Sequence, residues 1–227
     1  MSYNIGQFKR TQLGVNSPYE TLVDKNKYAI SDSSDNTSSP GSISMNGDNY
    51  FDAGVIYHLS TTLLGKQNNQ VRIKLQNGTD GNDFQTIKIT KITGNNGKKN
   101  IDLIFLPLRK FQKIVFENMD SLSKDRIHAS NNINTKIYTM TNIVKHLNLD
   151  KMSQIGIQGP EGLIFAINGN QLQIGKSGIF MSEEMEITSL CFVADPSKKV
   201  VDENENELNV EHPFFIVDYQ YKEEKEI

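Results

Sequence analysis

The chain has 227 residues, with 24 lysines and arginines against 27 aspartates and glutamates, one cysteine and no tryptophan. A net charge of −3 argues against a nucleic-acid partner, which usually requires a basic excess. One thiol cannot form an internal disulfide, and the apolar runs are far shorter than the roughly 20 residues of a membrane helix. The N-terminal sequence MSYNIGQFKR contains no apolar signal-peptide region. We therefore expect a soluble protein of a reducing compartment, with no membrane partner.

Turn-forming residues occur throughout the chain, where 24 asparagines are interspersed with glycine, aspartate and serine. Asparagine and glycine tolerate positive φ and end strands and helices. Their density predicts many short elements joined by turns, and therefore a mainly β fold.

Residues 1–49 predict an N-terminal arm, which is either one strand or an extended segment, followed by a flexible polar loop. The stretch SDSSDNTSSPGSIS at 31–44 has too few apolar residues to be buried and is typical of a long loop or linker.

Residues 50–118 predict a β-sandwich domain of the jelly-roll type. Apolar and polar residues alternate with a period of two at 71–75 and 87–92, which places one face on a core and the other in water. Further strand-like runs occupy 55–59, 101–105 and 113–116. The connections between them are too short for helical crossovers, which favours a sandwich.

Residues 119–153 predict a short helical connector. Asp120 and Ser121 can cap a turn that runs to His128. The segment TNIVKHLNL at 141–149 has apolar spacing for about two turns of amphipathic helix.

Residues 154–221 predict a small C-terminal β domain, and 222–227 a charged tail. A hairpin is expected around 168–170, a second reversal at 175–178 and a closing strand over 214–221. The acidic stretch 195–211 is expected to be a solvated loop or an extended hairpin tip. A unit of about 65 residues is marginal for independent folding, so we expect it to be stabilised by packing against the first domain or a neighbouring subunit.

Motifs for catalysis, metal binding or phosphate binding do not occur in the sequence. Cys191 lies between Leu190 and Phe192, which favours a buried strand residue over a nucleophile. The four histidines are scattered along the chain: His58, His128, His146 and His212. We therefore predict no enzymatic activity, no cofactor and no metal.

Aromatic residues leave a binding alternative open. Tyr28, Tyr50, Phe51 and Tyr57 could together present a face to a sugar. Core packing and subunit contacts explain these residues at least as well, and the absence of tryptophan weakens the sugar interpretation.

Two parts of the sequence resemble a known family. The stretches FDAGVIYHL, VRIKL, FQTI, LIFLPL and FQKIVF between 51 and 116 resemble jelly-roll modules in virion proteins of tailed phages that infect Gram-positive bacteria. The stretches IGIQGPEGLIFAINGNQLQIGKSGIF (155–180), ITSLCFV (187–193) and FFIVDYQY (214–221) are similar to a C-terminal unit that recurs in such proteins. That unit has a GxQGPPG-like turn, an INGEEIRIGRSGIYE-like hairpin and a FILDYQY-like closing strand. Glu161 replaces the second proline here, and Lys176 replaces the arginine.

This resemblance implies a non-enzymatic structural component of the virion, assembled in the host cytoplasm, with the tail or baseplate as the expected location. Its partners would be further copies of the chain and other virion proteins. The alternative is an adsorption module that binds host cell-wall polysaccharide. The hairpin and the closing strand would offer backbone edges to neighbouring chains. The residues expected to form the turn and assembly motif are Gly156, Gly159, Pro160, Gly162, Asn168, Gly169, Gly175, Gly178, Asp218, Tyr219 and Tyr221.

Overall fold

The fold is mainly β, with antiparallel sheets and little helix, as the density of turn residues predicts. No helix of the described segments is long and apolar enough to cross a membrane. The computed structural model describes residues 8–13, 20–31, 40–78, 82–94, 96–120, 125–130, 134–146, 152–159, 161–193 and 215–221.

The chain divides into two compact units. The central unit comprises residues 21–139, and the terminal unit comprises residues 1–20 together with 140–227. These boundaries differ from the predicted ones, because strands on both sides of 50–118 belong to the sandwich. The chain passes from one unit to the other within two strands, β2 (Glu20–Leu22) and β11 (Lys136–Met140).

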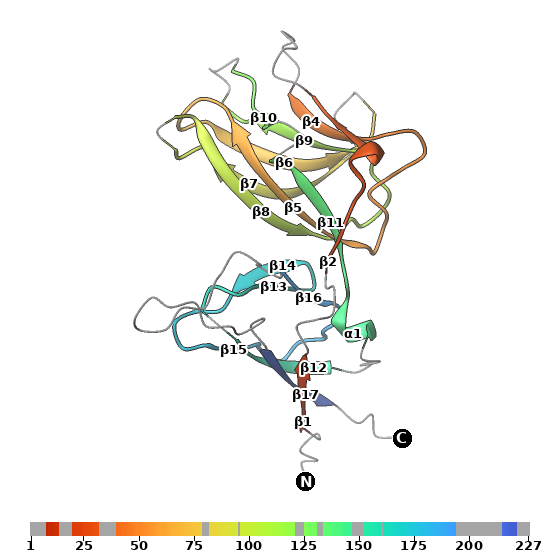
Figure 1. Cartoon of the computed structure of the whole chain (residues 1–227), viewed down its shortest axis with the longest axis vertical. Helices are drawn as coiled ribbons and strands as arrows, with labels where there is room; N and C mark the ends of the chain where they lie inside the picture. The colour runs from red at the N-terminus through yellow and green to blue at the C-terminus, as the bar shows by residue number, and fades with distance from the viewer. Residues whose placement is uncertain are drawn as a thin grey trace. The chain divides into compact units, whose positions relative to one another are not determined.

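The central unit is a sandwich of two sheets (Figure 1). Strand β5 pairs with β8, β10 and β11 in one sheet, and β2 lies beyond β11. The other sheet has the order β3-β4-β9-β6-β7. A 3-10 turn, η1 (Lys25–Lys27), precedes β3. The remaining strands are β3 (Tyr28–Ile30), β4 (Gly41–Met45), β5 (Ile56–Leu64), β6 (Gln70–Gln76), β7 (Phe84–Lys91), β8 (Lys98–Phe105), β9 (Lys113–Asn118) and β10 (His128–Ala129).

Alternate residues from both sheets form one core in the central unit. Ile73 and Phe116 come from one sheet, Leu59 and Leu103 from the other, and all belong to one buried cluster. Burial of each such side chain stabilises the fold by about 1.5–3 kcal/mol. The strands predicted from periodicity in this region are therefore confirmed.

Strand β4 lies inside the stretch that was predicted to be a flexible loop. Its residues alternate in burial, with Gly41, Ile43 and Met45 inside. A Cβ atom at Gly41 would lie 2.4 Å from the carbonyl oxygen of Ile127, so the glycine allows a close backbone approach. The small residues of this segment reflect tight packing. Residues 32–39 of the predicted loop lie outside the described residues.

The helical connector is largely replaced by strands. Strands β10 and β11 occupy part of it, and α1 spans only Ile143–His146, within the predicted 141–149 helix. The Oδ1 atom of Asn142 accepts a hydrogen bond from the amide of Val144 and so caps this turn. Residues 121–124 of the first predicted turn lie outside the described residues.

The terminal unit contains a four-stranded and a three-stranded sheet. Figure 1 shows the red strand β1 beside the blue strand β17, so both ends of the chain share one sheet. Its order is β1-β17-β12-β15, and that of the smaller sheet is β14-β13-β16. The strands are β1 (Phe8–Leu13), β12 (Met152–Gln158), β13 (Ile164–Ile167), β14 (Asn170–Gln173), β15 (Ile179–Met181), β16 (Leu190–Phe192) and β17 (Phe215–Tyr221).

One expectation for the chain ends is wrong and one is confirmed. Strand β17 does not form a sheet edge, because it pairs with β1 on one side and with β12 on the other. The strand that was one of two alternatives for the N-terminal segment is present as β1, which pairs with β17 in this sheet. The acidic stretch 195–211 and the tail 222–227 lie outside the described residues.

Candidate functional site

The predicted hairpin has the geometry that its sequence suggests. Ile167 pairs with Asn170, which leaves Asn168 and Gly169 as a two-residue loop with φ of 49° and 79°. Positive φ at both positions is the requirement of a type I′ turn. The Asn168 side chain also accepts a bond from the amide of Thr188 (2.9 Å) and donates to the carbonyl of Glu186 (2.7 Å). Asn168 thus fixes the segment before β16 as well as the hairpin.

Other glycines of the predicted motif form the path into and out of this hairpin. The amide of Gly159 donates to the carbonyl of Gly178 (2.9 Å), and the amide of Gly162 donates to Ile174 (2.8 Å). Gly162 and Gly178 have φ of 82° and 70°, which an L side chain rarely adopts. Gly175 has open space around it and no positive φ, so neither packing nor backbone conformation requires glycine at this position.

The remaining motif residues occupy the larger sheet. Gly156 lies on β12 opposite Met181 and Asp218. Tyr219 and Tyr221 follow on β17, paired through the backbone with β12. Pro160 lies outside the described residues. The motif thus builds the sheets and turns of the terminal unit.

Strand β15 is an edge that sequence reasoning did not single out. In the part of the sheet that the structure describes, it pairs with β12 on one side and stands last in the strand order. Ile179 and Met181 project from one face and are 55% and 58% exposed, while Phe180 packs against the core from the other. Met185 nearby in the sequence is 39% exposed. Ile179, Phe180 and Met181 are all apolar, so the sequence shows no alternation of apolar and polar residues here. It therefore does not indicate which face of β15 is exposed to solvent.

The four aromatic residues proposed for sugar binding do not share an exposed face. Tyr28, Phe51 and Tyr57 are buried in the core of the central unit. Burial raises the pKa of both tyrosines, and the Tyr57 hydroxyl accepts a bond from the Asp52 amide (2.9 Å). Only Tyr50 among the four is exposed, with the Lys110 ammonium 5.7 Å from its ring centroid.

His58 and Asp102 form a polar pair on the central unit. The Nε2 atom of His58 lies 3.3 Å from Oδ1 of Asp102, and the imidazole stacks on Tyr138 at 5.5 Å. Its hydrogen bond holds the pKa of the Asp102 carboxyl below the usual range. Within the described segments, no three histidine, cysteine or acidic side chains are grouped to hold a metal ion.

Cys191 is buried on β16, as the sequence predicted. Desolvation raises the pKa of its thiol to about 12. The thiolate is the reactive form of cysteine, so this side chain has a packing role at neutral pH.

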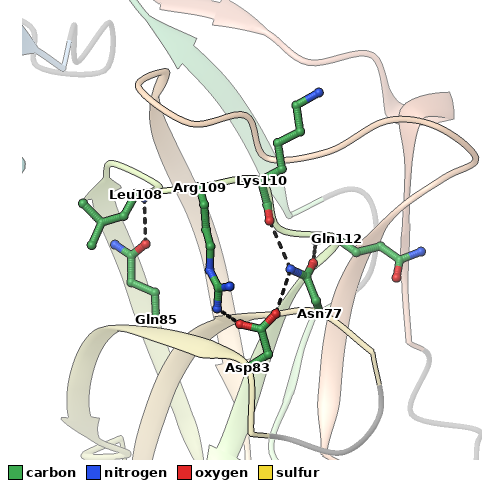
Figure 2. Close-up of polar contacts among 7 residues, drawn as sticks. All are labelled: Asn77, Asp83, Gln85, Leu108, Arg109, Lys110 and Gln112. Carbon is green, nitrogen blue, oxygen red and sulfur yellow. Dashed lines mark hydrogen bonds and ion pairs between the residues drawn. The ribbon is translucent and has the colours of Figure 1, made fainter.

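Figure 2 shows polar contacts that hold the segment from Leu108 to Gln112 against the hairpin of β6 and β7. The Gln85 amide donates to the carbonyl of Leu106 (3.0 Å) and accepts from the amide of Leu108 (2.9 Å). The Asn77 amide donates to the carbonyl of Lys110 (3.1 Å) and accepts from the amide of Gln112 (2.9 Å).

An ion pair completes this group of contacts. Arg109 binds Asp83, and the Asn77 amide donates to the same carboxylate (3.3 Å) (Figure 2). The contacts fix the backbone of the loop while Leu108 remains 80% exposed. Asn77-Gly78 belongs to the turn-forming residues that are evident in the sequence, but no local pattern identifies its partners in 106–112.

The outward face of β6, β7 and β9 carries a second polar cluster. Glu117 binds Lys74 through Oε1 (3.1 Å) and Arg72 through Oε2 (3.4 Å). The Phe84 ring covers both cations, with the Lys74 ammonium 4.8 Å from its centroid. Phe84 and Ile89 stay 38% and 50% exposed on this face.

A shallow hollow lies next to Ile89 at the end of this sheet. Polar and apolar residues line it: Asn68, Gln70, Ile89, Thr90, Lys91 and Asp120. No protein-family model, curated protein or solved structure matches this chain.

Proposed function

We propose that the protein is a non-enzymatic structural component of a bacteriophage virion, located in the tail or baseplate. It would be assembled in the host cytoplasm and would act through self-association and the docking of neighbouring virion proteins. The similarity of 155–180, 187–193 and 214–221 to the C-terminal unit of such proteins supports this proposal. The same residues supply turns and strands of the terminal unit.

The observation that carries the proposal is the apolar edge of β15. Edge strands of monomeric proteins usually carry charged side chains or prolines that prevent pairing with another chain. Strand β15 instead presents Ile179 and Met181 beside its unpaired backbone edge in the described part of the sheet. Such an edge is suited to strand addition, in which backbone hydrogen bonds give affinity and alternate side chains give specificity.

Sedimentation velocity of the full chain tests the self-association. We expect the wild-type protein to form a defined oligomer and Met181→Lys to shift it to the monomer, because a charge at the edge opposes strand pairing. Leu108→Lys is the matched control, since it also replaces an exposed apolar residue with lysine, but in the central unit. A wild-type chain that stays monomeric, or equal association of the two variants, would contradict the proposal.

Mass spectrometry of purified phage particles, separated into head and tail fractions, tests the location. The protein should be found in the tail fraction in stoichiometric amounts. Its absence from intact particles would contradict a structural role.

A further inference from the structure

The hollow beside Ile89 lies on the outward face of the central sandwich. Antiparallel pairing places Gln70 opposite Lys91 and Arg72 opposite Ile89. Val71, between Gln70 and Arg72 on β6, is fully buried in the core. Since side chains alternate along a strand, the other four residues project from the opposite, outward face.

One carboxylate at the rim of the hollow is fixed in place. The Oδ2 atom of Asp120 accepts a hydrogen bond from the amide of Gln70 (3.1 Å). The amide of Asp120 donates to the side chain of Asn118 (3.0 Å). Within the described segments Oδ1 of Asp120 has no donor, so a carboxylate oxygen of defined position remains for a ligand.

Hydrogen-bond donors line the hollow together with this acceptor. The Lys91 ammonium and the side-chain amides of Asn68 and Gln70 make no hydrogen bond or ion pair with the described residues. One cation and one anion give the lining no net charge. Ile89 adds an apolar surface, half of which is exposed.

This combination selects a class of ligand. A neutral lining with both donors and acceptors favours an uncharged molecule that is rich in hydroxyl groups, because each hydroxyl both donates and accepts. The apolar face of Ile89 favours a molecule that also has C–H surface. A pyranose ring has both properties.

We propose that this hollow is a saccharide-binding subsite. Ile89 contacts the apolar face of the sugar ring, Oδ1 of Asp120 accepts from a ring hydroxyl, and Lys91 and Asn68 donate to neighbouring hydroxyls. The subsite goes beyond the structural role proposed above and does not depend on it. It is also distinct from the four aromatic residues considered from the sequence.

Saturation-transfer difference NMR on the full chain tests the subsite, with glucose, galactose, rhamnose and N-acetylglucosamine as probes. We expect saturation transfer to at least one probe, and calorimetry then gives its affinity. Lys91→Ala and Asp120→Asn should each weaken binding about 10-fold to 100-fold, the range for a lost hydrogen bond to a charged group. Asp120→Asn keeps an oxygen for the amide of Gln70, so the rim retains its structure.

Lys88→Ala is the matched control. It removes an exposed lysine from the same strand, but Lys88 does not line the hollow. Its affinity for the probe should equal that of the wild type. Three results would overturn the proposal: no transfer to any probe, equal affinity in all three variants, or loss of binding on Tyr50→Ala with Lys91→Ala unaffected.

Discussion

The central unit takes its sandwich from one continuous stretch of chain, whereas the terminal unit combines a strand from each end of the sequence. The central core joins two five-stranded sheets, while the terminal core lies in sheets of four and three strands. A larger core buries more apolar surface and leaves a larger stability reserve. The terminal unit should therefore unfold after a smaller loss of stabilising contacts than the central unit. It is also the unit that contains the apolar edge strand β15.

Removing one buried aromatic ring from each unit tests this difference most strongly. Phe116 in the central unit and Phe165 in the terminal unit are both fully buried. Truncation of either to alanine should lower the free energy of unfolding by about 3–5 kcal/mol. We expect Phe165→Ala to abolish protection of β13 in hydrogen exchange, while Phe116→Ala leaves β5 measurably protected. Equal loss of protection in the two variants would show that the two units have similar free energies of unfolding.

A pair of glycines gives a smaller effect that separates a closely packed position from an open one. A Cβ atom at Gly41 would lie 2.4 Å from Ile127 O and 2.5 Å from the backbone of His128, so Gly41→Ala should cost about 1–3 kcal/mol as overpacking. Gly175 has nothing within 4 Å and no positive φ, so Gly175→Ala should change stability by less than about 0.5 kcal/mol. Chemical denaturation measures both. A neutral Gly41→Ala would show that β4 has more room than its contacts indicate.

Cys191 provides a probe that perturbs neither unit. It is the only cysteine, it is buried in the terminal unit, and desolvation raises the pKa of its thiol to about 12. A thiol-specific reagent at pH 7 to 8 should therefore label it only when the terminal unit opens. Phe165→Ala should accelerate labelling and Phe116→Ala should leave the rate unchanged. Rapid labelling of the folded wild type would contradict the burial of this strand.

Local patterns in the sequence were sufficient for much of the fold. The period of two in 71–75 and 87–92 identified β6 and β7, and Asn168-Gly169 identified the hairpin with its turn geometry. Both depend on residues close together in the chain, where side-chain alternation and φ preference decide the conformation.

Features that depend on distant partners could not be predicted in the same way. The pairing of β1 with β17 joins opposite ends of the chain, and no local pattern specifies that partner. Strand β4 was missed because glycine and serine are typical of loops, although Gly41 is required by the approach of Ile127. The contacts of Gln85 with residues 106–108 are equally non-local.

The position of β17 between β1 and β12 has a consequence for biosynthesis. About 200 residues separate the end of β1 from the start of β17, so at 5–20 residues per second the ribosome needs roughly 10–40 s to supply the missing strand. During this time β1 lacks β17, its partner among the described strands, and all residues of the central unit are synthesised before β17 is made. The terminal unit is therefore the last part of the molecule to form, although it contains the first strand to be made.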